Sequence, residues 1–294
     1  MDTQPLVLEN GVRMVRAANP SAMTLSGTNT YIIGTGDVAV IDPGPTLPSH
    51  FKAILAALAP GERVSHIFVT HAHLDHSPLA RPLAEATGAQ VLAFGPPTAG
   101  RSAVMTALAK TGLSSGGEGV DHGFTPDIRL TNGEAVAHGD WSLTALHTPG
   151  HFCNHLCFQW RDIVFSGDHV MGWASTLISP PDGDLSDYLA SLAYLRTVSA
   201  RVFYSGHGDP IGHPNQRLDD LIRHRQGRTA QILDALTHGP ATPADLTARI
   251  YTDTPKALMA AARRNVFAHL IDLTLKNQIT ADGEFTENTL FSRR

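Results

Sequence analysis

Four side chains that could bind metal lie within six residues in the first third of the chain. Directly after the apolar run 64–69 come His71, His73, Asp75 and His76. The run is typical of a buried strand, and polar groups at the end of such a strand are costly to desolvate without compensation. A divalent metal ion provides that compensation, because imidazole nitrogen and carboxylate oxygen are ligands for zinc, iron and manganese. The sequence therefore predicts a metal site here.

The spacing of these side chains allows more than one ion. On an extended strand His71, His73 and Asp75 would share one face, and His76 would lie on the other. In a tight turn from strand to helix, His71 and His73 can hold one ion while Asp75 and His76 hold a second. A histidine-rich surface loop is the alternative, but further candidate ligands downstream favour the metal site.

Three later segments repeat this arrangement. Each places a histidine or a carboxylate after an apolar strand, in a turn that contains glycine. The three candidates are His151 after Pro149-Gly150, Asp168 after Gly167, and His207 after Gly206. Strand ends are where a sheet collects site residues from distant parts of a chain. We therefore expect these residues to complete the site begun by the histidine cluster.

The elements that must position these residues alternate strands with helices through the first two thirds of the chain. Strands are predicted at 30–34, 38–42, 64–69, 90–93, 134–137, 142–147, 156–159, 163–166 and 202–204. Helices are predicted at 49–58, 79–87, 103–110 and 186–197, with Ser186 as the cap of the last. This order indicates two β-sheets faced by helices. The remainder of segment 96–122 is predicted to be a mobile or extended loop beside the site.

After Pro214 the composition shifts towards a mainly helical tail. Apolar periodicity predicts a helix over 215–238, and Thr242-Pro243-Ala244-Asp245 is a capping box with proline at the first helical position. Thr254-Pro255 predicts the start of another helix, which reaches about residue 277. Residues 279–285, centred on Asp282-Gly283, are predicted to form a small hairpin. Three helices and a hairpin indicate a winged helix, so we expect domains at 1–213 and 214–294.

The overall composition is that of an ordinary globular protein. The 294 residues are 42% hydrophobic and 17% charged, and the net charge of -5 provides no basic field that would attract nucleic acid. The first five residues carry no basic region, and no apolar run approaches the ~20 residues of a membrane helix. These features predict a cytoplasmic protein without a membrane partner. Cys153 and Cys157 are too far apart on a strand for a disulfide and are expected to be reduced.

Residues 20–213 resemble the metallo-β-lactamase superfamily. His-x-His-x-Asp-His, Thr-Pro-Gly-His, Gly-Asp and Gly-His occur here in that family's order. The resemblance implies an α/β fold, a four-layer αβ/βα sandwich with a dinuclear metal site between its sheets. It implies two divalent ions, by default Zn²⁺, with Fe or Mn as alternatives. It also implies that the first ion is held by His71, His73 and His151 and the second by Asp75, His76 and His207, with Asp168 bridging both.

The segment from Asn19 to Tyr31 and the winged-helix tail look like the beta-lactamase-like protein 2 branch of this superfamily. One member of that branch is a single-strand endoribonuclease. Asp168 stands where the best-known class of true β-lactamases has cysteine, which argues against antibiotic hydrolysis. The short segment between Asp168 and His207 lacks the long insert of a β-CASP nuclease.

The chemistry that this resemblance implies is metal-dependent hydrolysis. Two metal ions about 3.5–4 Å apart would lower the pKa of a bridging water, and the resulting hydroxide would attack a carbonyl carbon or a phosphorus. Asp75 would both bind metal and orient this nucleophile. His169 and His213 are candidate proton donors to the leaving group, with a packed or hydrogen-bonded histidine as the favoured alternative for each. Asp42 would either fix a ligand histidine or cap its Asp-Pro-Gly turn.

Two substrate classes stay open at this point. Single-stranded RNA is supported by the resemblance and by tail arginines, namely Arg223, Arg225, Arg228, Arg263 and Arg264. The favoured alternative for these arginines is that they solvate helix faces. A small ester or thioester, as in hydroxyacylglutathione hydrolases, is the second class. A winged-helix nucleic-acid-binding regulator is least favoured, because all seven ligands are present. The tail would otherwise cover the active-site mouth or form a homodimer interface.

Overall fold

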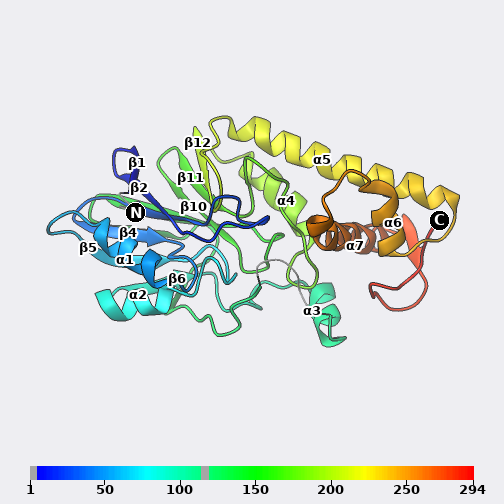
Figure 1. Ribbon diagram of the computed structural model, residues 1–294, viewed down its shortest axis with the longest axis horizontal. Coiled ribbons are helices and arrows are strands. Elements are labelled where there is room, and N and C mark those ends of the chain that lie inside the picture. The colour runs from blue at the N-terminus through cyan, green and yellow to red at the C-terminus, as the bar shows by residue number, and fades with distance from the viewer. Residues whose placement is uncertain (1–4, 114–118) are drawn as a thin grey trace.

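Two stacked β-sheets form the centre of the fold in a computed structural model that describes residues 5–113 and 119–294 (Figure 1). The first sheet runs in sequence order through β1 (Leu6–Glu9), β2 (Val12–Arg16), β3 (Asn29–Ile33), β4 (Asp37–Ile41), β5 (Arg63–Phe68), β6 (Gln90–Ala93) and β7 (Ile128–Arg129). The second has the order β12-β11-β10-β9-β8. Its strands are β8 (Ala135–His138), β9 (Trp141–His147), β10 (Leu156–Trp160), β11 (Ile163–Gly167) and β12 (Val202–Ser205).

Strand direction brings the candidate site residues to one edge of the sandwich. Strands β4 and β5 pair in parallel, so Asp42 and the histidine cluster follow the same ends of neighbouring strands. Strands β11 and β12 are also parallel, which places Asp168 beside His207. Because parallel strands end at a common edge, residues far apart in the chain meet there. A backbone bridge between Thr28 and His207 joins the edges of the two sheets.

Helices cover the outer face of each sheet, which gives the predicted αβ/βα layers. The first sheet is covered by α1 (Pro48–Ala56) and α2 (Ala80–Thr87), and the second by α4 (Leu185–Leu195) and the start of α5 (Pro214–Ala235). Leu83 packs in the first helix–sheet core, Phe158 between the sheets, and Leu192 in the second helix–sheet core. Alternation of side chains along each strand supplies both of its faces with apolar residues.

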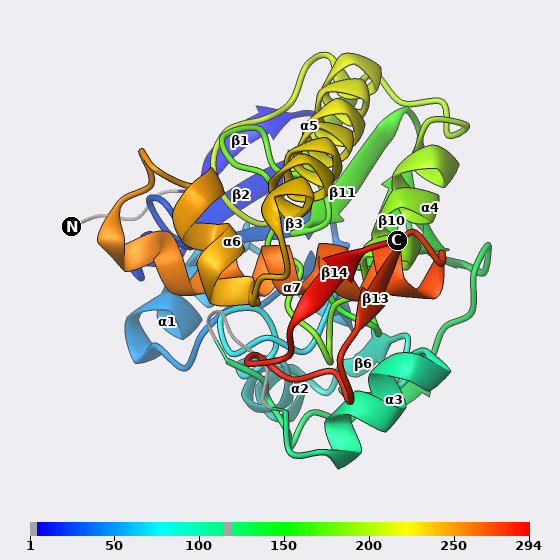
Figure 2. The ribbon, with the colours of Figure 1, turned by 90° about the vertical axis from the view of Figure 1, so that its right-hand side faces the viewer.

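The C-terminal region lies at one end of the sandwich (Figures 1 and 2). After α5 it contains η1 (Leu236–His238), α6 (Pro243–Ile250), η2 (Lys256–Leu258), α7 (Met259–Leu275), β13 (Ile279–Ala281) and β14 (Phe291–Arg293). Its core joins Ile232, Leu246 and Leu270 to Met105 and Leu108 of α3 (Ala103–Lys110). The start of α5 packs on the second sheet, and α3, which precedes residue 213, packs in the tail core. The division at residue 213 therefore stays a prediction.

Most local predictions agree with these elements, and the capping box is present. The side chain of Thr242 accepts a hydrogen bond from the backbone of Asp245, and the Asp245 carboxylate accepts one from the backbone of Thr242. The predicted cap of helix α4, Ser186, is wrong. The cap is Asp184, whose Oδ1 accepts from the backbone nitrogen of Ser186 at 2.9 Å, because a carboxylate satisfies the free N–H groups of a first turn.

Two predictions about the tail are wrong. Residues 254–255 do not open a single long helix, because the 3₁₀ turn η2 precedes α7. The hairpin does not close tightly around Asp282-Gly283, because β13 pairs with β14, which begins only at Phe291.

The sequence pattern also does not predict strands β1, β2 and β7, although β2 pairs with β3 along its whole length. These short strands gain their stability from neighbouring strands rather than from their own pattern.

The cysteines and the helices' ability to span a membrane can be compared with the predictions as well. Cys153 and Cys157 are buried and free, as predicted. The part of the predicted loop at 114–118 and the first four residues lie outside the described residues. No helix within the described ranges is long and apolar enough to cross a membrane.

A buried histidine in the tail predicts an acid-sensitive contribution to stability. His269 lies on α7, with its Nδ1 3.0 Å from Thr229 Oγ1. Burial lowers its pKa well below 6.5, and the charge of Arg225 lowers it further. As the pH falls below about 6.5, the unfolded chain therefore takes up a proton that the folded chain does not, and stability falls. His269→Asn should reduce this acid dependence by up to about 1.4 kcal/mol per pH unit.

Urea unfolding at pH 7, 6 and 5 gives the free energy of unfolding of the wild type and of His269→Asn. The effect is the change with pH in the difference between these two free energies. Packing losses in the variant cancel, because they are the same at each pH. His238→Asn is the control, since His238 is exposed and hydrated in both states. A stability difference that stays constant from pH 7 to pH 5 for His269→Asn would contradict the prediction.

Candidate metal centre

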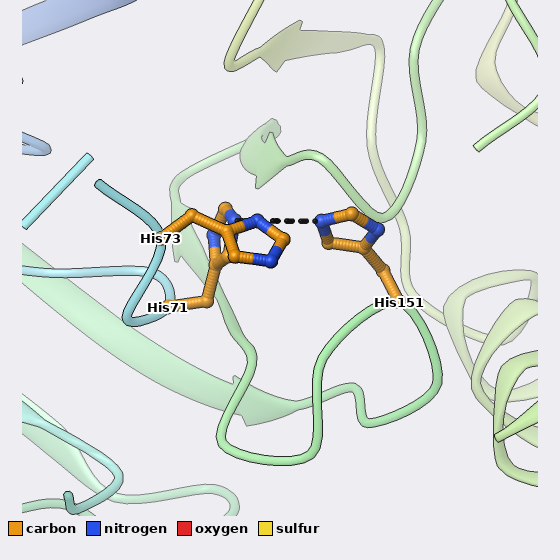
Figure 3. Close-up of side chains that lie close together, drawn as sticks. All are labelled: His71, His73 and His151. Carbon is orange, nitrogen blue, oxygen red and sulfur yellow. Dashed lines mark hydrogen bonds between the residues drawn. The ribbon is translucent and has the colours of Figure 1, made fainter. Parts of the chain in front are cut away.

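Three histidines from two loops converge to form the first cluster. His71 and His73 follow β5, and His151 lies between β9 and β10 (Figure 3). His73 Nδ1 lies 2.8 Å from His71 Nε2 and 3.2 Å from His151 Nε2. The turn before His151 requires Gly150, because its φ is +136° and a Cβ there would lie 2.3 Å from the Cα of Tyr188. Helix α4 thus fixes the loop that presents His151.

The charge state of this cluster suits a cation. Burial lowers the pKa of His71 well below its usual value and that of His73 to about 3, and neighbouring histidines lower both further. Burial also lowers the pKa of His151. Neutral imidazole offers a nitrogen lone pair, and three such nitrogens converge here. A metal ion would satisfy all three at once.

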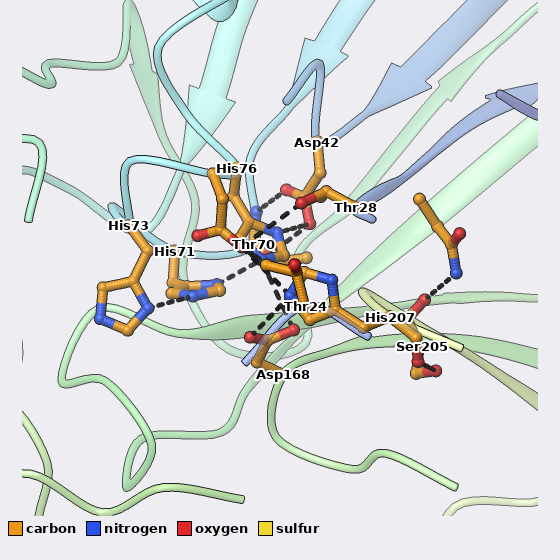
Figure 4. Close-up of polar contacts among 12 residues, drawn as sticks. Thr24, Thr28, Asp42, Thr70, His71, His73, His76, Asp168, Ser205 and His207 are labelled. Atoms are coloured by element: carbon orange, nitrogen blue, oxygen red, sulfur yellow. Dashed lines mark hydrogen bonds and ion pairs between the residues drawn. The ribbon is translucent and has the colours of Figure 1, made fainter. Parts of the chain in front are cut away.

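The second cluster consists of two carboxylates and two histidines, all buried: Asp75, His76, Asp168 and His207. His207 Nε2 lies 3.1 Å from Asp75 Oδ2 and 3.2 Å from Asp168 Oδ2. His76 Nε2 lies 3.3 Å from Asp75 Oδ2 and 3.5 Å from Asp168 Oδ1. Figure 4 shows Asp168, His207 and His76 facing one another. Asp168 Oδ2 is also 3.9 Å from His151 Nε2, so this carboxylate faces both clusters.

Opposite charges dominate the second cluster. Burial opposes the charged form of His207, but Asp168 and Asp75 outweigh it and raise the pKa of His207 to about 10. Burial likewise opposes ionisation of Asp168, but His207 and His76 hold its pKa well below the usual range. The two histidines thus carry protons where the carboxylates need positive charge. A divalent ion would replace those protons.

Polar partners behind the clusters fix the histidine rings. Asp42 Oδ2 accepts from His76 Nδ1 at 2.8 Å and from Thr70 Oγ1 at 2.7 Å (Figure 4). Thr70 Oγ1 in turn lies 3.0 Å from His71 Nδ1. The Asp42 carboxylate therefore orients His76 directly and His71 through Thr70. Of the two interpretations of Asp42, this favours the one in which it fixes ligand histidines. Its φ of +51° is strained for a non-glycine residue, as is common where function fixes the backbone.

Two further rings are held by backbone carbonyls, which sequence reasoning did not find. His151 Nδ1 is 2.8 Å from the carbonyl oxygen of Leu177, and His207 Nδ1 is 3.2 Å from that of Gly27. In each case the other ring nitrogen, Nε2, is left for the cluster. No residue type signals such a partner, because every residue has a carbonyl group.

The donor atoms fit two metal ions. In each cluster the candidate ligand atoms all lie within 4.8 Å of one another. Among the described residues, Asp75 Oδ1, His76 Nε2, Asp168 Oδ1 and His207 Nε2 are buried without a hydrogen-bond partner. Buried polar atoms without partners are rare and call for an explanation such as an ion. These clusters of histidine and aspartate are able to bind metal ions.

The two candidate proton donors lie elsewhere. His169 is fully buried, its ring centroid is 4.7 Å from that of Tyr188, and burial lowers its pKa to about 3. It is therefore neutral near pH 7 and is not the imidazolium that would act as a strong proton donor. His213 is exposed and precedes α5. Neither residue lines the cavity that opens from the clusters. The geometry therefore favours the packed interpretation of His169, and among the described residues His213 makes no contact with the clusters.

A cavity of about 200 Å³ opens from the clusters towards the tail. His73, His151 and Asp168 lie at its inner end. Its larger apolar side chains come from the loop around Met23, the loop after β11, and the tail, and they are Met23, Met171, Trp173, Leu177, Tyr251 and Leu258. Within the part of the chain that the structure describes, no lysine or arginine lines this cavity.

Comparison with known proteins identifies the family. The model of the metallo-beta-lactamase superfamily matches residues 23–207, which contain both clusters. The chain belongs to this superfamily. A model of the beta-lactamase associated winged helix domain matches residues 242–286, so the predicted winged helix is confirmed as well.

Relatives within the superfamily support the predicted branch. A beta-lactamase-like protein 2 homolog from Caenorhabditis elegans is 30% identical over 88% of this chain and 82% of its own length. An atrochrysone carboxyl ACP thioesterase from Aspergillus fumigatus is 30% identical over 85% of this chain and 76% of its own. The protein is thus a hydrolase of the metallo-beta-lactamase fold.

Solved structures of the superfamily share the whole fold. A beta-lactamase domain protein from Burkholderia ambifaria has a TM-score of 0.81 at 22% identity and covers 99% of this chain and 93% of its own. A metallo-beta-lactamase family protein from Thermus thermophilus has a TM-score of 0.79 at 24% identity, covering 98% and 100%. The four-layer sandwich and the winged helix therefore occur together in both.

A glycine beside the second cluster provides a test of its geometry. A Cβ on Gly206 would lie 2.3 Å from Asp168 Oδ1 and 2.7 Å from His76 Cε1. Gly206→Ala must therefore displace both side chains, and we expect zinc affinity to fall about 10–100-fold, as when supporting contacts of a metal site are lost. Equilibrium dialysis with elemental analysis measures the affinity.

Gly212→Ala is the matched control, because a Cβ on Gly212 would meet nothing within 4 Å. Thermal unfolding of both variants separates loss of the fold from loss of the site. Zinc affinity equal to that of the wild type in a folded Gly206→Ala protein would show that Asp168 and His76 do not share an ion.

Proposed function

We propose that this protein hydrolyses small carboxylic thioesters or esters with two divalent ions, by default Zn²⁺. One ion would be held by His71, His73 and His151, the other by Asp75, His76 and His207, with Asp168 between them. The residues that line the cavity are the observation on which the choice of substrate class rests. Its apolar walls suit an acyl group, and the absence of lysine and arginine from its described lining disfavours a phosphodiester backbone.

The tail arginines give the RNA hypothesis little support. Arg263 and Arg264 pair with Glu287 at 3.1 and 3.2 Å. The Arg228 guanidinium lies 4.1 Å from the Tyr251 ring centroid. Arg223 pairs with Asp220, and Arg225 is fully buried. These side chains are engaged within the chain, whereas a nucleic-acid groove presents free cations to phosphates.

Three side chains, Asp75, Asp42 and Thr70, would support the proposed hydrolysis in different ways. Bound metal ions would supply an activated water and polarise the substrate carbonyl. Asp75 Oδ1 has no hydrogen-bond partner among the described residues, so it can accept one from that water and orient it. Asp42 and Thr70 keep the rings of His71 and His76 in place.

The leaving group favours a thioester over an alkyl ester. Neither His169 nor His213 lines the described cavity, so neither is positioned to protonate an alkoxide. A thiol has a pKa near 8.5 and leaves as the thiolate without help. The thioesterase name of one relative agrees with this assignment.

A substrate comparison on zinc-loaded protein tests the proposal. We expect hydrolysis of octanoyl and acetyl thioesters of N-acetylcysteamine, with the longer chain preferred, and lower activity on S-lactoylglutathione, whose acyl group is small and polar. Single-stranded RNA should stay intact under the same conditions. Cleavage of RNA without turnover of any thioester would overturn the proposal in favour of the nuclease.

A further inference from the structure

Helix α7 brings one amide side chain, Asn265, to the wall of the cavity. Its Oδ1 accepts a hydrogen bond from the backbone nitrogen of Ile178 at 3.0 Å and from Arg225 Nη1 at 3.1 Å. The residue is only half-buried, so part of it faces the cavity. The two donors come from different parts of the chain, and both bind the same oxygen of the amide.

The orientation of this amide follows from the chemistry of its neighbours. A backbone N–H and a guanidinium can only donate, so both require an oxygen from Asn265. The amide cannot flip without placing its NH₂ group against two donors. The NH₂ group of Asn265 therefore has a fixed direction, and it has no hydrogen-bond partner within residues 5–113 and 119–294.

Arg225 holds this arrangement at a high cost in desolvation. Its side chain is 1% exposed and donates to the carbonyl oxygen of Thr176 and to Asn265. No carboxylate of the described residues lies within ion-pair distance of it. A buried charge without a counter-charge is costly to desolvate, so its remaining polar partners are needed to hold it. The guanidinium also lies 5.3 Å from the Tyr188 ring centroid, so carbonyl, amide and aromatic partners together hold it rigidly beside Asn265.

We propose that Asn265 is a specificity residue that donates a hydrogen bond to an oxygen atom in the acyl part of the substrate. This rests on the proposed thioester hydrolysis and narrows its substrate class to oxygenated acyl groups, such as oxoacyl thioesters. In an otherwise apolar cavity, one fixed donor orients the ligand and selects for an acceptor. Arg225 acts as a positioning residue, because it touches Asn265 and not the cavity.

The kinetic test compares thioesters that differ only in one oxygen. Octanoyl, 3-oxooctanoyl and 5-oxooctanoyl thioesters of N-acetylcysteamine are hydrolysed by zinc-loaded protein, and each oxo/parent ratio of kcat/KM is taken. Asn265→Asp keeps the acceptor for Ile178 and Arg225 but removes the donor. We expect the larger of the two ratios to fall at least tenfold in this variant. Intrinsic reactivity cancels, because the same substrates are compared in both proteins.

A binding measurement separates this inference from the proposed function. Thioether analogues, in which a methylene group replaces the scissile carbonyl, cannot be hydrolysed. Calorimetry on the same proteins should show that an oxo group tightens binding to the wild type at least tenfold and to Asn265→Asp not at all. Asn288→Asp, an exposed site, is the matched control and should behave as the wild type. Thermal unfolding confirms that each variant is folded.

The outcomes are distinct. If the wild type hydrolyses all three thioesters but Asn265→Asp leaves both oxo/parent ratios unchanged, the role of Asn265 is wrong and the thioesterase proposal stands. If no thioester is hydrolysed, but the oxo analogue binds more tightly than the parent analogue to the wild type and not to Asn265→Asp, the proposed function is wrong. The role of Asn265 as a hydrogen-bond donor to the ligand is then still supported. If neither activity nor oxo-dependent binding is found, both are overturned.

Discussion

Replacement of Asp75 by asparagine is expected to lower kcat for thioester hydrolysis at least 100-fold while changing KM by less than about threefold. Asp75 lies in the second cluster, where its Oδ2 faces both His76 and His207. Asparagine keeps the shape of the side chain but removes the charge that balances two buried histidines. It also places an NH₂ group where the proposed nucleophilic water would need an acceptor.

Such a loss of turnover with retained affinity indicates a group that acts on the reaction and not on binding of the acyl chain. Steady-state kinetics with octanoyl thioester, together with the zinc content of each protein, measure it. Asp209→Asn is the control, because its side chain is 94% exposed and lies two residues beyond His207. Residual activity in Asp75→Asn equal to the wild type would sink the dinuclear mechanism.

Filling the cavity should change the substrate preference by a similar factor. Ala261 lines the cavity on α7 and is half-buried. Ala261→Phe would occupy space that an acyl chain needs, and each methylene group that is excluded forfeits about 0.8 kcal/mol, or about fourfold. We expect kcat/KM for the octanoyl thioester to fall at least 100-fold, while that for the acetyl thioester stays within threefold.

The neighbouring residue provides the control for this variant. Ala260 is exposed and does not line the cavity, so Ala260→Phe should leave both substrates unaffected. The ratio of the two kcat/KM values is the measurement, since it is independent of the fraction of active protein. Equal losses on acetyl and octanoyl substrates would mean that the acyl chain lies elsewhere.

The candidate ligands were accessible from sequence because each follows a strand and belongs to a short, dense motif. The spacing predicts that His71 and His73 separate from Asp75 and His76, and the structure places the two pairs in separate clusters. Their metal-binding role stays a prediction. Asp42 could be singled out but not assigned, because an Asp-Pro-Gly turn looks the same whether or not its carboxylate reaches a distant ring.

Other parts of the site left no local signal. The carbonyl groups that hold His151 and His207 belong to Leu177 and Gly27, residues of no distinctive chemistry. The predicted cap of α4 lies two residues from the true one, because Asp184 and Ser186 are both good caps and only the path of the chain decides between them. The proline at residue 255 suggested a helix start, but a 3₁₀ turn precedes α7.

The sequence by itself determined the family, the order of the candidate ligand motifs and the chemistry that their side chains can support. These features are local, since ligand type and strand pattern are written in neighbouring residues. The tertiary structure alone decided what the site faces. The apolar cavity and the amide of Asn265 arise where the tail packs against loops more than eighty residues away in sequence, as the bond from Ile178 to Asn265 shows. Substrate choice depends on such distant packing, which no local pattern encodes.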